Sequence, residues 1–184
     1  CEAKKIKSFT LFVSRDALNI DGLSEATLEK FINKGFLHEF ADIFRLSRYE
    51  KEITLMEGFG EKSYQNLINS IDTARTTILP RVIYVLGITV IGLANAKMIC
   101  RYYRDDLEAM EHAQIEELSE IDGIGEVLAG AFCEYFQEPE NVEQLEHLLQ
   151  EITIVTEKVD EAQQTLSGLT FVITGTLLHY ENRN

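Results

Sequence analysis

The chain of 184 residues is poor in proline and cysteine, with two and three residues, and has 17 Lys or Arg against 31 Asp or Glu. Few prolines in a sequence that is 45% hydrophobic favour a helical globular fold. Three cysteines form no disulfide framework, which favours a reducing cytosol. No apolar run approaches the roughly 20 residues of a membrane span, and the first residues lack the pattern of a secretory signal. We therefore expect a cytoplasmic protein that makes no membrane contact.

The formal charge of −14 argues against binding to nucleic acid through a broad basic surface, because phosphates repel such a protein at long range. Within about a Debye length, roughly 8 Å at physiological salt, local geometry can outweigh the net charge. Any contact with nucleic acid must therefore come from local features, and its affinity is limited.

A short glycine turn recurs four times along the chain. The copies are Ile20-Asp21-Gly22-Leu23-Ser24, Met56-Glu57-Gly58-Phe59-Gly60, the looser Leu86-Gly87-Ile88-Thr89-Val90-Ile91-Gly92, and Ile121-Asp122-Gly123-Ile124-Gly125. If Ser24, Gly60, Gly92 and Gly125 are equivalent, successive copies lie 36, 32 and 33 residues apart. A nearly fixed period of this size indicates a repeated supersecondary unit.

Apolar residues follow each turn at the same three distances, four, seven and eight positions beyond its last residue. They are Leu28, Phe31 and Ile32; Tyr64, Leu67 and Ile68; Ala96, Ile99 and Cys100; and Ala129, Phe132 and Cys133. This spacing places each set on one face of a helix. The sequence therefore predicts an all-α fold in which four helices, each opened by a glycine turn, bury one stripe.

The chemistry of such a turn suits a phosphate. Its first glycine can adopt a positive φ, and its second lacks a Cβ, so an anion can approach the free N–H groups and positive dipole end of the next helix. Such contacts read the backbone and not the bases, so binding does not depend on sequence. A single copy could equally be a plain packing unit between two helices. Four copies favour DNA binding, with two turns related by a pseudo-twofold axis holding both strands across the minor groove.

The candidate DNA-binding residues are those of the turns and two lysines that follow them. They are Gly22, Leu23, Ser24, Gly58, Phe59, Gly60, Lys62, Gly87, Ile91, Gly92, Lys97, Gly123, Ile124 and Gly125. The second and third turns are the strongest candidates, because Lys62 and Lys97 follow them, whereas Glu25 and Glu126 follow the first and fourth. Ser24 can replace glycine because serine caps a helix start.

Between the turns, the pattern predicts further helices. One opens at Ser14, short ones cover 41–46, 81–86 and 105–110, and a last one opens at Pro139, while the stretch 115–119 leads into the fourth turn. The helices after the turns end near residues 33, 76, 103 and 136. The polar stretch 156–167 is typical of a linker, and 169–175 predicts a buried strand. Because no second strand follows before residue 184, we expect this strand to have no partner and the chain to be cut inside a further domain.

No catalytic motif is found. The sequence has no nucleotide-binding P-loop, no catalytic triad and no metal cluster. The nearest match to the K-x-D-G motif of nucleotidyl transfer is Lys158-Val159-Asp160-Glu161, which has Glu in place of Gly and lies in the polar stretch. Cys100 and Cys133 occupy equivalent positions on the apolar stripes and are expected in the core. We expect the chain alone to be non-catalytic.

Together these residues closely resemble the C-terminal half of the bacterial NAD-dependent DNA ligases. The similarity lies in residues 12–23, in the turns at 58–63, 86–92 and 121–125, and in 166–177, which resembles the first strand and turn of the family's BRCT domain. The resemblance implies the end of a zinc-finger module at 1–13, helix–hairpin–helix pairs at 14–78 and 79–155, a linker at 156–165 and a truncated BRCT domain at 166–184.

For the parent protein, the resemblance implies sealing of nicks in DNA during replication and repair, with NAD and magnesium bound outside this region. It implies that Cys1 is the last of four zinc ligands. Because the other three are absent, we expect no metal here. Thr174 and Gly175 match the phosphate-binding turn of BRCT domains. The expected partner is nicked double-stranded DNA, bound by a monomer at the bacterial nucleoid.

Two other interpretations stay open on the residues alone. The chain could be a helix–hairpin–helix module of another repair protein, such as a nuclease or a junction-binding subunit. Its acidic charge also fits a helical scaffold for protein interactions.

Overall fold

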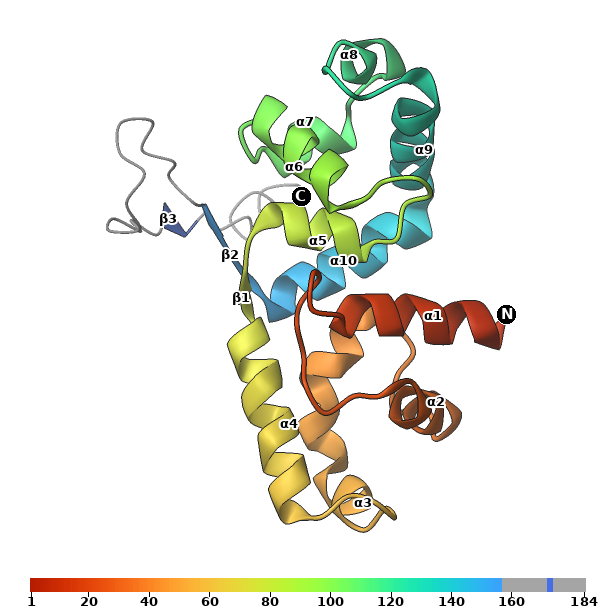
Figure 1. Ribbon diagram of the computed structural model, residues 1–184, viewed down its shortest axis with the longest axis vertical. Coiled ribbons are helices and arrows are strands. Elements are labelled where there is room, and N and C mark those ends of the chain that lie inside the picture. Colours follow the sequence, from red (N-terminus) through yellow and green to blue (C-terminus); the bar gives the residue numbers. More distant parts are fainter. Residues whose placement is uncertain (157–171, 174–184) are drawn as a thin grey trace, which may run out of the picture.

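The computed structural model describes residues 1–156 and 172–173, and this part of the chain is mostly helical (Figure 1). Its first half contains four α-helices and a 3₁₀ helix: α1 (Glu2–Val13), α2 (Glu25–Asn33), η1 (Phe40–Tyr49), α3 (Glu50–Thr54) and α4 (Glu61–Ala74). The second half contains α5 (Leu79–Val85), α6 (Leu93–Tyr102), α7 (Leu107–Glu111), α8 (Ile115–Ser119), α9 (Glu126–Gln137) and α10 (Pro139–Glu151).

The predicted apolar stripes form much of the core and are buried, apart from the half-buried Ile32 and Ile68. Leu28, Leu67, Ile99 and Phe132 are each 0% exposed, although they come from four different helices. α1 packs on α2, α3 on α4, α5 on α6, and α8 on α9, so each helix after a turn lies against the helix before that turn. Both prolines lie in the first turn of a helix, where their missing N–H has no helical partner to lose.

The start of the chain differs from expectation. The structure has α1 at Glu2–Val13, and Ser14 ends this helix instead of opening one. Lys4 and Lys7 lie on its exposed side, while Phe9, Phe12 and Val13 are buried. The helical spacing of these three apolar residues was the available signal for this helix.

A small sheet makes the expected all-α fold incomplete. β1 (Thr76–Thr77) pairs in parallel with β2 (Thr153–Thr156), which pairs antiparallel with β3 (Val172–Ile173). The helix predicted to reach residue 76 ends at Ala74, and Thr156 belongs to β2 instead of a linker. The expectation that the strand near 172 has no partner is wrong as well. The rest of the linker, the remainder of 166–184, and Lys158 to Glu161 lie outside the described residues.

The two halves are joined by arginines that bind carbonyl and carboxylate oxygens. Arg45 Nε donates to Glu151 Oε1 at 2.8 Å, and Arg75 donates to the carbonyl oxygens of Glu151 at 3.0 Å and Phe44 at 2.8 Å. The hydrogen bond with Glu151 raises the pKa of the Arg45 guanidinium. Arg81 donates to the carbonyl of Ala17 at 2.7 Å. These contacts connect α10 with η1 and α4, and α5 with the segment after α1.

Candidate nucleic-acid interface

Four turns with closely related backbones precede α2, α4, α6 and α9. We name them turn 1 (20–24), turn 2 (56–60), turn 3 (88–92) and turn 4 (121–125). In turns 2, 3 and 4 the fourth residue donates its N–H to the carbonyl of the first, at 3.0, 3.0 and 2.9 Å. The third residue of every turn has a positive φ, of 94° at Gly22, 83° at Gly58, 62° at Val90 and 88° at Gly123.

Each helix after a turn begins in the same way. The last residue of the turn is the extended N-cap, and its carbonyl accepts the first helical hydrogen bond, at 2.9 Å for Ser24, 3.0 Å for Gly60 and Gly92, and 2.9 Å for Gly125. The next backbone N–H groups have no helical acceptor, as at any helix N-terminus. Ser24 also accepts from the N–H of Thr27 through its side chain, which makes it a true cap, as predicted.

The third turn corrects one assignment from the sequence. Gly87, expected as the first glycine of this copy, ends α5 with a φ of 67° and lies before the turn. Val90 occupies the position of Gly22, Gly58 and Gly123. The signal was present in the sequence, because Val90 lies two residues before Gly92, as Gly58 lies two residues before Gly60. Val90 is 59% exposed, so burial of its side chain does little to offset the cost of a left-handed backbone at a β-branched residue.

The turns present backbone at the surface and keep their apolar side chains inside. Ser24, Gly60 and Gly125 are exposed and Gly92 is half-buried. A Cβ added at Gly60 or Gly125 meets no atom within 4 Å, and one at Gly92 meets only Asn95 Oδ1 at 3.9 Å. The fourth residues of the turns are buried in turns 1, 3 and 4 and half-buried in turn 2: Leu23, Ile91, Ile124 and Phe59. These four side chains anchor the turns, so any contact that they make to a ligand comes from their backbone.

Turns 1 and 2 each pack on the helix that follows the other. Gly22 lies against Leu67 of α4, whose side chain a Cβ would meet at 3.5 Å, and the N–H of Asp21 donates to Ser70 Oγ at 2.8 Å. In return, the ring of Phe59 lies 5.8 Å from that of Phe31 on α2. Both contacted residues lie seven positions after the end of their own turn. The first two units are therefore related by a reciprocal contact.

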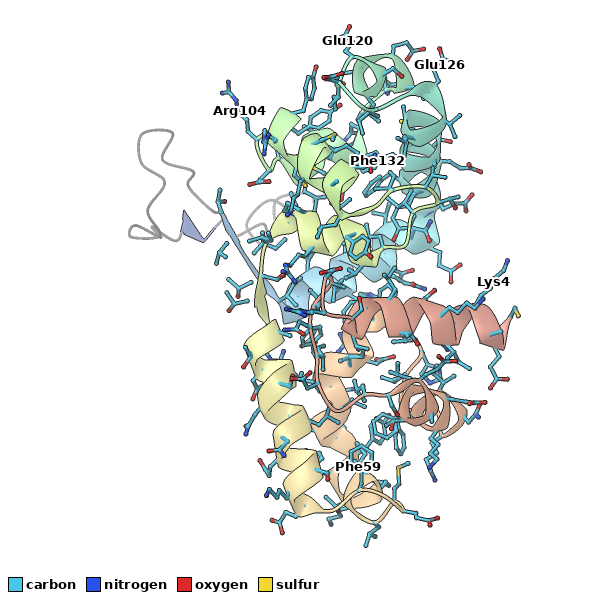
Figure 2. All side chains as sticks on the ribbon, viewed as in Figure 1. Lys4, Phe59, Arg104, Glu120, Glu126 and Phe132 are labelled. Carbon is cyan, nitrogen blue, oxygen red and sulfur yellow. The ribbon has the colours of Figure 1, made fainter. Side chains whose placement is uncertain are left out.

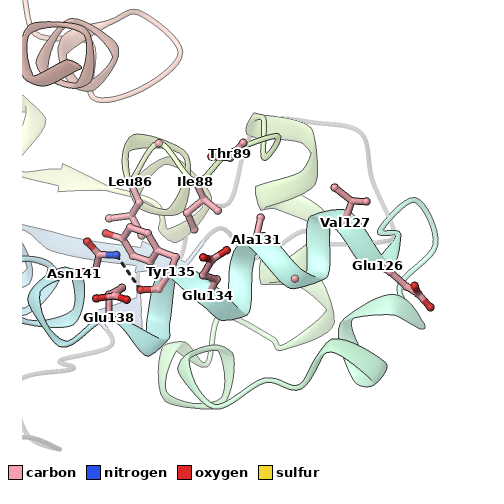
Figure 3. A pocket seen from close by; sticks show the side chains of 12 residues that line it. Leu86, Ile88, Thr89, Glu126, Val127, Ala131, Glu134, Tyr135, Glu138 and Asn141 are labelled. Atoms are coloured by element: carbon pink, nitrogen blue, oxygen red, sulfur yellow. Dashed lines mark hydrogen bonds between the residues drawn. The ribbon is translucent and has the colours of Figure 1, made fainter. Parts of the chain in front are cut away.

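In the second half, turn 4 packs on α6, and turn 3 faces α9 across a pocket. A Cβ at Gly123 would lie 3.2 Å from Met98 Sδ. The pocket has a volume of about 750 Å³ and is lined by residues 86–89 and by one side of α9 that includes Glu126 and Glu134 (Figure 3). The second half thus resembles the first, because each turn faces the helix that follows the other turn. Turn 4 is in direct contact with α6, whereas a pocket lies between turn 3 and α9.

Charge is strongly segregated along the chain. Residues 1–104 contain 15 Lys or Arg and 12 Asp or Glu, and within this part residues 73–104 contain no acidic residue. Residues 105–156 contain 15 Asp or Glu and no Lys or Arg. In Figure 2, Arg104 lies at the left of the upper part of the molecule, whereas Glu120 and Glu126 lie at its top and right. Turns 1, 2 and 3 belong to the first region and turn 4 to the second.

The first turns of the four helices differ accordingly. Glu25, Glu61 and Glu126 each open their helix, whereas the first turn of α6 has no acidic residue. Lys62 and Lys97, the two lysines predicted to bind DNA, are both exposed. Neither has an ion-pair partner within the part of the chain that the structure describes.

The cysteines fall into two groups. Cys100 and Cys133 are buried, as predicted, and burial raises the pKa of both thiols, which keeps them protonated. Cys133 donates a hydrogen bond to the carbonyl of Ala113 at 3.2 Å. Cys1 is exposed at the start of α1, and no group of three or more potential metal ligands occurs among residues 1–156 and 172–173. Thr174 and Gly175 lie outside the described residues.

No helix within the described ranges is long and apolar enough to span a membrane.

Comparison with known families identifies the class of these regions. The family model described as "SAM-like Helix-hairpin-helix tandem" matches residues 14–73, and that described as "Helix-hairpin-helix motif" matches residues 81–145. These two regions, which contain all four turns, are therefore helix–hairpin–helix regions.

Curated relatives then indicate the particular protein. The chain is 55% identical to a DNA ligase of Lachnoclostridium phytofermentans and 45% identical to one of Ruminiclostridium cellulolyticum, in each case over 100% of the chain and 28% of the relative. A DNA ligase of Shewanella frigidimarina is 36% identical over the whole chain. The predicted resemblance is confirmed: the chain corresponds over its full length to part of a DNA ligase. It spans about 28% of the length of the first two relatives.

Proposed function

We propose that this chain is the sequence-independent duplex-binding part of an NAD-dependent DNA ligase that seals nicks during replication and repair. The observation that carries the proposal is the set of four surface turns that share a positive φ at the third residue, each opening a helix, in a chain that corresponds to part of DNA ligases. Free N–H groups at a helix start, with the positive end of the helix dipole, favour a phosphate.

The four turns act as four helix–hairpin–helix motifs in two pairs, at 14–78 and 79–155. The reciprocal packing of turns 1 and 2 supports a pseudo-twofold relation, which suits the antiparallel strands of a duplex. Gly60 and Gly92 offer the best approach to a phosphate, because each is followed by an exposed lysine, Lys62 or Lys97. All these contacts reach the DNA backbone, so they position the duplex without reading its sequence.

In the parent ligase this part contributes positioning, which is a large effect when two DNA ends must be aligned. NAD and magnesium belong to other parts of the protein, which works as a monomer in the bacterial cytoplasm, at the nucleoid. Residues 166–184 begin a BRCT domain. A structural zinc needs four protein ligands, and the described residues offer the single exposed Cys1 for it, so zinc at this end requires ligands from elsewhere in the parent.

The decisive experiment places a negative charge at the turns without disturbing the fold. Gly60→Asp and Gly92→Asp fit sterically, and aspartate is a favourable N-cap, so the double variant keeps or gains stability. Its carboxylates occupy the positions where phosphates approach. The matched control is Gly60→Ser with Gly92→Ser, which caps both helices without charge, as Ser24 does.

Binding is measured by fluorescence anisotropy of a labelled nicked duplex at low salt. The unmodified chain should bind with a Kd on the order of 10⁻⁴–10⁻⁶ M, as nonspecific contacts do. The affinity of the Asp variant should fall about tenfold or more, because two charge-assisted contacts become repulsive. The affinity of the Ser variant should stay near that of the unmodified chain. Equal binding by the Asp and Ser variants would refute the proposal and favour an acidic protein-interaction scaffold.

A further inference from the structure

Turns 3 and 4 share one backbone geometry but differ in their electrostatic surroundings. Their N-caps, Gly92 and Gly125, have φ values of −88° and −87° and ψ values of −179° and 177°. Neither position is sterically blocked, since the nearest atom to a Cβ at Gly92 is 3.9 Å away and none lies within 4 Å at Gly125. Backbone geometry and steric access therefore do not separate these turns, whereas charge does.

Turn 3 lies in a segment of the chain that contains no carboxylate. Residues 73–104 contain five Lys or Arg and no Asp or Glu. The first turn of α6 has no acidic residue and includes Asn95, whose side chain lies next to Gly92. Lys97 is exposed on the same helix. A phosphate at turn 3 meets the helix dipole and a cation, with no carboxylate from its own segment; the carboxylates that face turn 3 are those of α9, where Glu126 and Glu134 line the pocket.

Turn 4 has the opposite environment. Glu126 is the first residue of α9, Asp122 lies within the turn, and Glu120 lies just before it, all three exposed. None of them forms an ion pair within residues 1–156 or 172–173. The Glu126 carboxylate lies in the first turn of α9, where it stabilises the helix and competes with a phosphate for the same positive end.

Resting on the proposed function, we propose that turn 4 is an electrostatically weakened phosphate site and that Glu126 sets its weakness. The second half then holds one strand firmly at turn 3 and the other loosely at turn 4. Loose contact at turn 4 lets this end of the domain leave the duplex first, while turn 3 remains bound. Turn 2 has acidic residues at the same two positions, Glu57 and Glu61, but the exposed Lys62 follows them, whereas residues 105–156 contain no Lys or Arg. The negative charge of residues 105–156 thus weakens phosphate binding at one turn, in addition to its general repulsion of DNA.

The test is a gain of affinity. Glu126→Gln should bind a labelled nicked duplex about two- to threefold more tightly at low salt, as expected for one unit charge removed several ångströms from a phosphate in water. The gain should shrink at physiological salt, where the Debye length is roughly 8 Å and binding is still measurable. Because Glu126 stabilises α9, the variant should melt slightly earlier, so the gain cannot come from a tighter fold.

Two further variants localise the effect. Glu143→Gln removes an exposed carboxylate on α10, which starts beyond the far end of the 12-residue helix α9, and should change affinity less than Glu126→Gln. Gly125→Asp in the Glu126→Gln background restores a charge at turn 4 and should abolish the gain. Equal effects of Glu126→Gln and Glu143→Gln would overturn the inference, and so would a gain that survives Gly125→Asp.

Failure of this inference can be separated from failure of the proposed function. If Gly60→Asp with Gly92→Asp weakens binding but Glu126→Gln does not strengthen it, DNA binding stands and only the role of turn 4 is wrong. If neither set of variants changes binding, the turns do not contact phosphate at all.

Discussion

Val90 provides a sharp test of the shared turn geometry, because it adopts a backbone conformation that glycine adopts in the other three turns. Its φ is 62°, against 94°, 83° and 88° at the three glycines. A left-handed backbone costs a residue with a Cβ roughly 1–2 kcal/mol, and a β-branched residue is the least suited to it. Replacing Val90 by Gly should remove this strain.

Two opposing effects reduce the gain. Glycine adds conformational freedom to the unfolded chain, which costs about 0.4–1 kcal/mol. The loss of burial is small, because Val90 is 59% exposed. The expected result for Val90→Gly is a net stabilisation of about 0.5–1 kcal/mol, or roughly 1–4 °C in Tm for a chain of this size.

Urea and thermal unfolding followed by circular dichroism measure this change, and Val127 supplies the matched control. Val127 is 77% exposed and lies in α9, where φ is helical. Val127→Gly should therefore destabilise, by about 0.5 kcal/mol, because glycine is the poorer helix former. If Val90→Gly destabilises as Val127→Gly does, the left-handed assignment at turn 3 is wrong.

Two further substitutions test other parts of the structure. Glu151→Gln should lower the free energy of unfolding in urea by about 1–2 kcal/mol, because it weakens the charge-assisted hydrogen bonds with Arg45 and Arg75 at a partly exposed site. A change below about 0.5 kcal/mol, as at an ordinary surface site, would contradict the role of these contacts in joining the two halves. Asp105→Asn should raise Tm at pH 7, because burial raises the pKa of Asp105 and its φ of 59° suits asparagine. With a folded-state pKa above the unfolded value, the ionised form costs stability at neutral pH and the protonated form does not. The advantage of the Asn variant should therefore shrink as the pH falls toward 4, and an advantage that is the same at both pH values would rule out this cause.

The helical units could be predicted from sequence because their signals are local. A glycine turn and apolar residues at fixed distances after it lie within about ten positions, and Leu28, Leu67, Ile99 and Phe132 are buried as the spacing predicts. α8, at Ile115–Ser119, occupies the stretch that the sequence showed only as leading into the fourth turn. α1 was not predicted, although Phe9, Phe12 and Val13 have helical spacing, because the residues before them are mostly polar or charged.

The remaining features depend on residues far apart in the chain. β1 has two residues that follow directly on α4, too few for any strand pattern, and its pairing joins Thr76 to Thr153. The Arg45–Glu151 contact links residues 106 positions apart. Both residues look like ordinary surface charges in the sequence. Such pairings become visible only when the fold brings η1, α4 and α10 together.

A chain with a formal charge of −14 can still lie against DNA when that charge is unevenly placed. The first 104 residues carry more basic than acidic residues, and they contain turns 1, 2 and 3. Screening confines the repulsion from residues 105–156 to about 8 Å at physiological salt, so it acts on what approaches this acidic part of the chain, which includes turn 4. Because the backbone at turn 4 matches that of turn 3, geometry alone assigns both the same function. The local charges distinguish the two turns. A tighter binding of DNA by Glu126→Gln would show that charge, and not backbone geometry, makes the two turns differ in phosphate affinity.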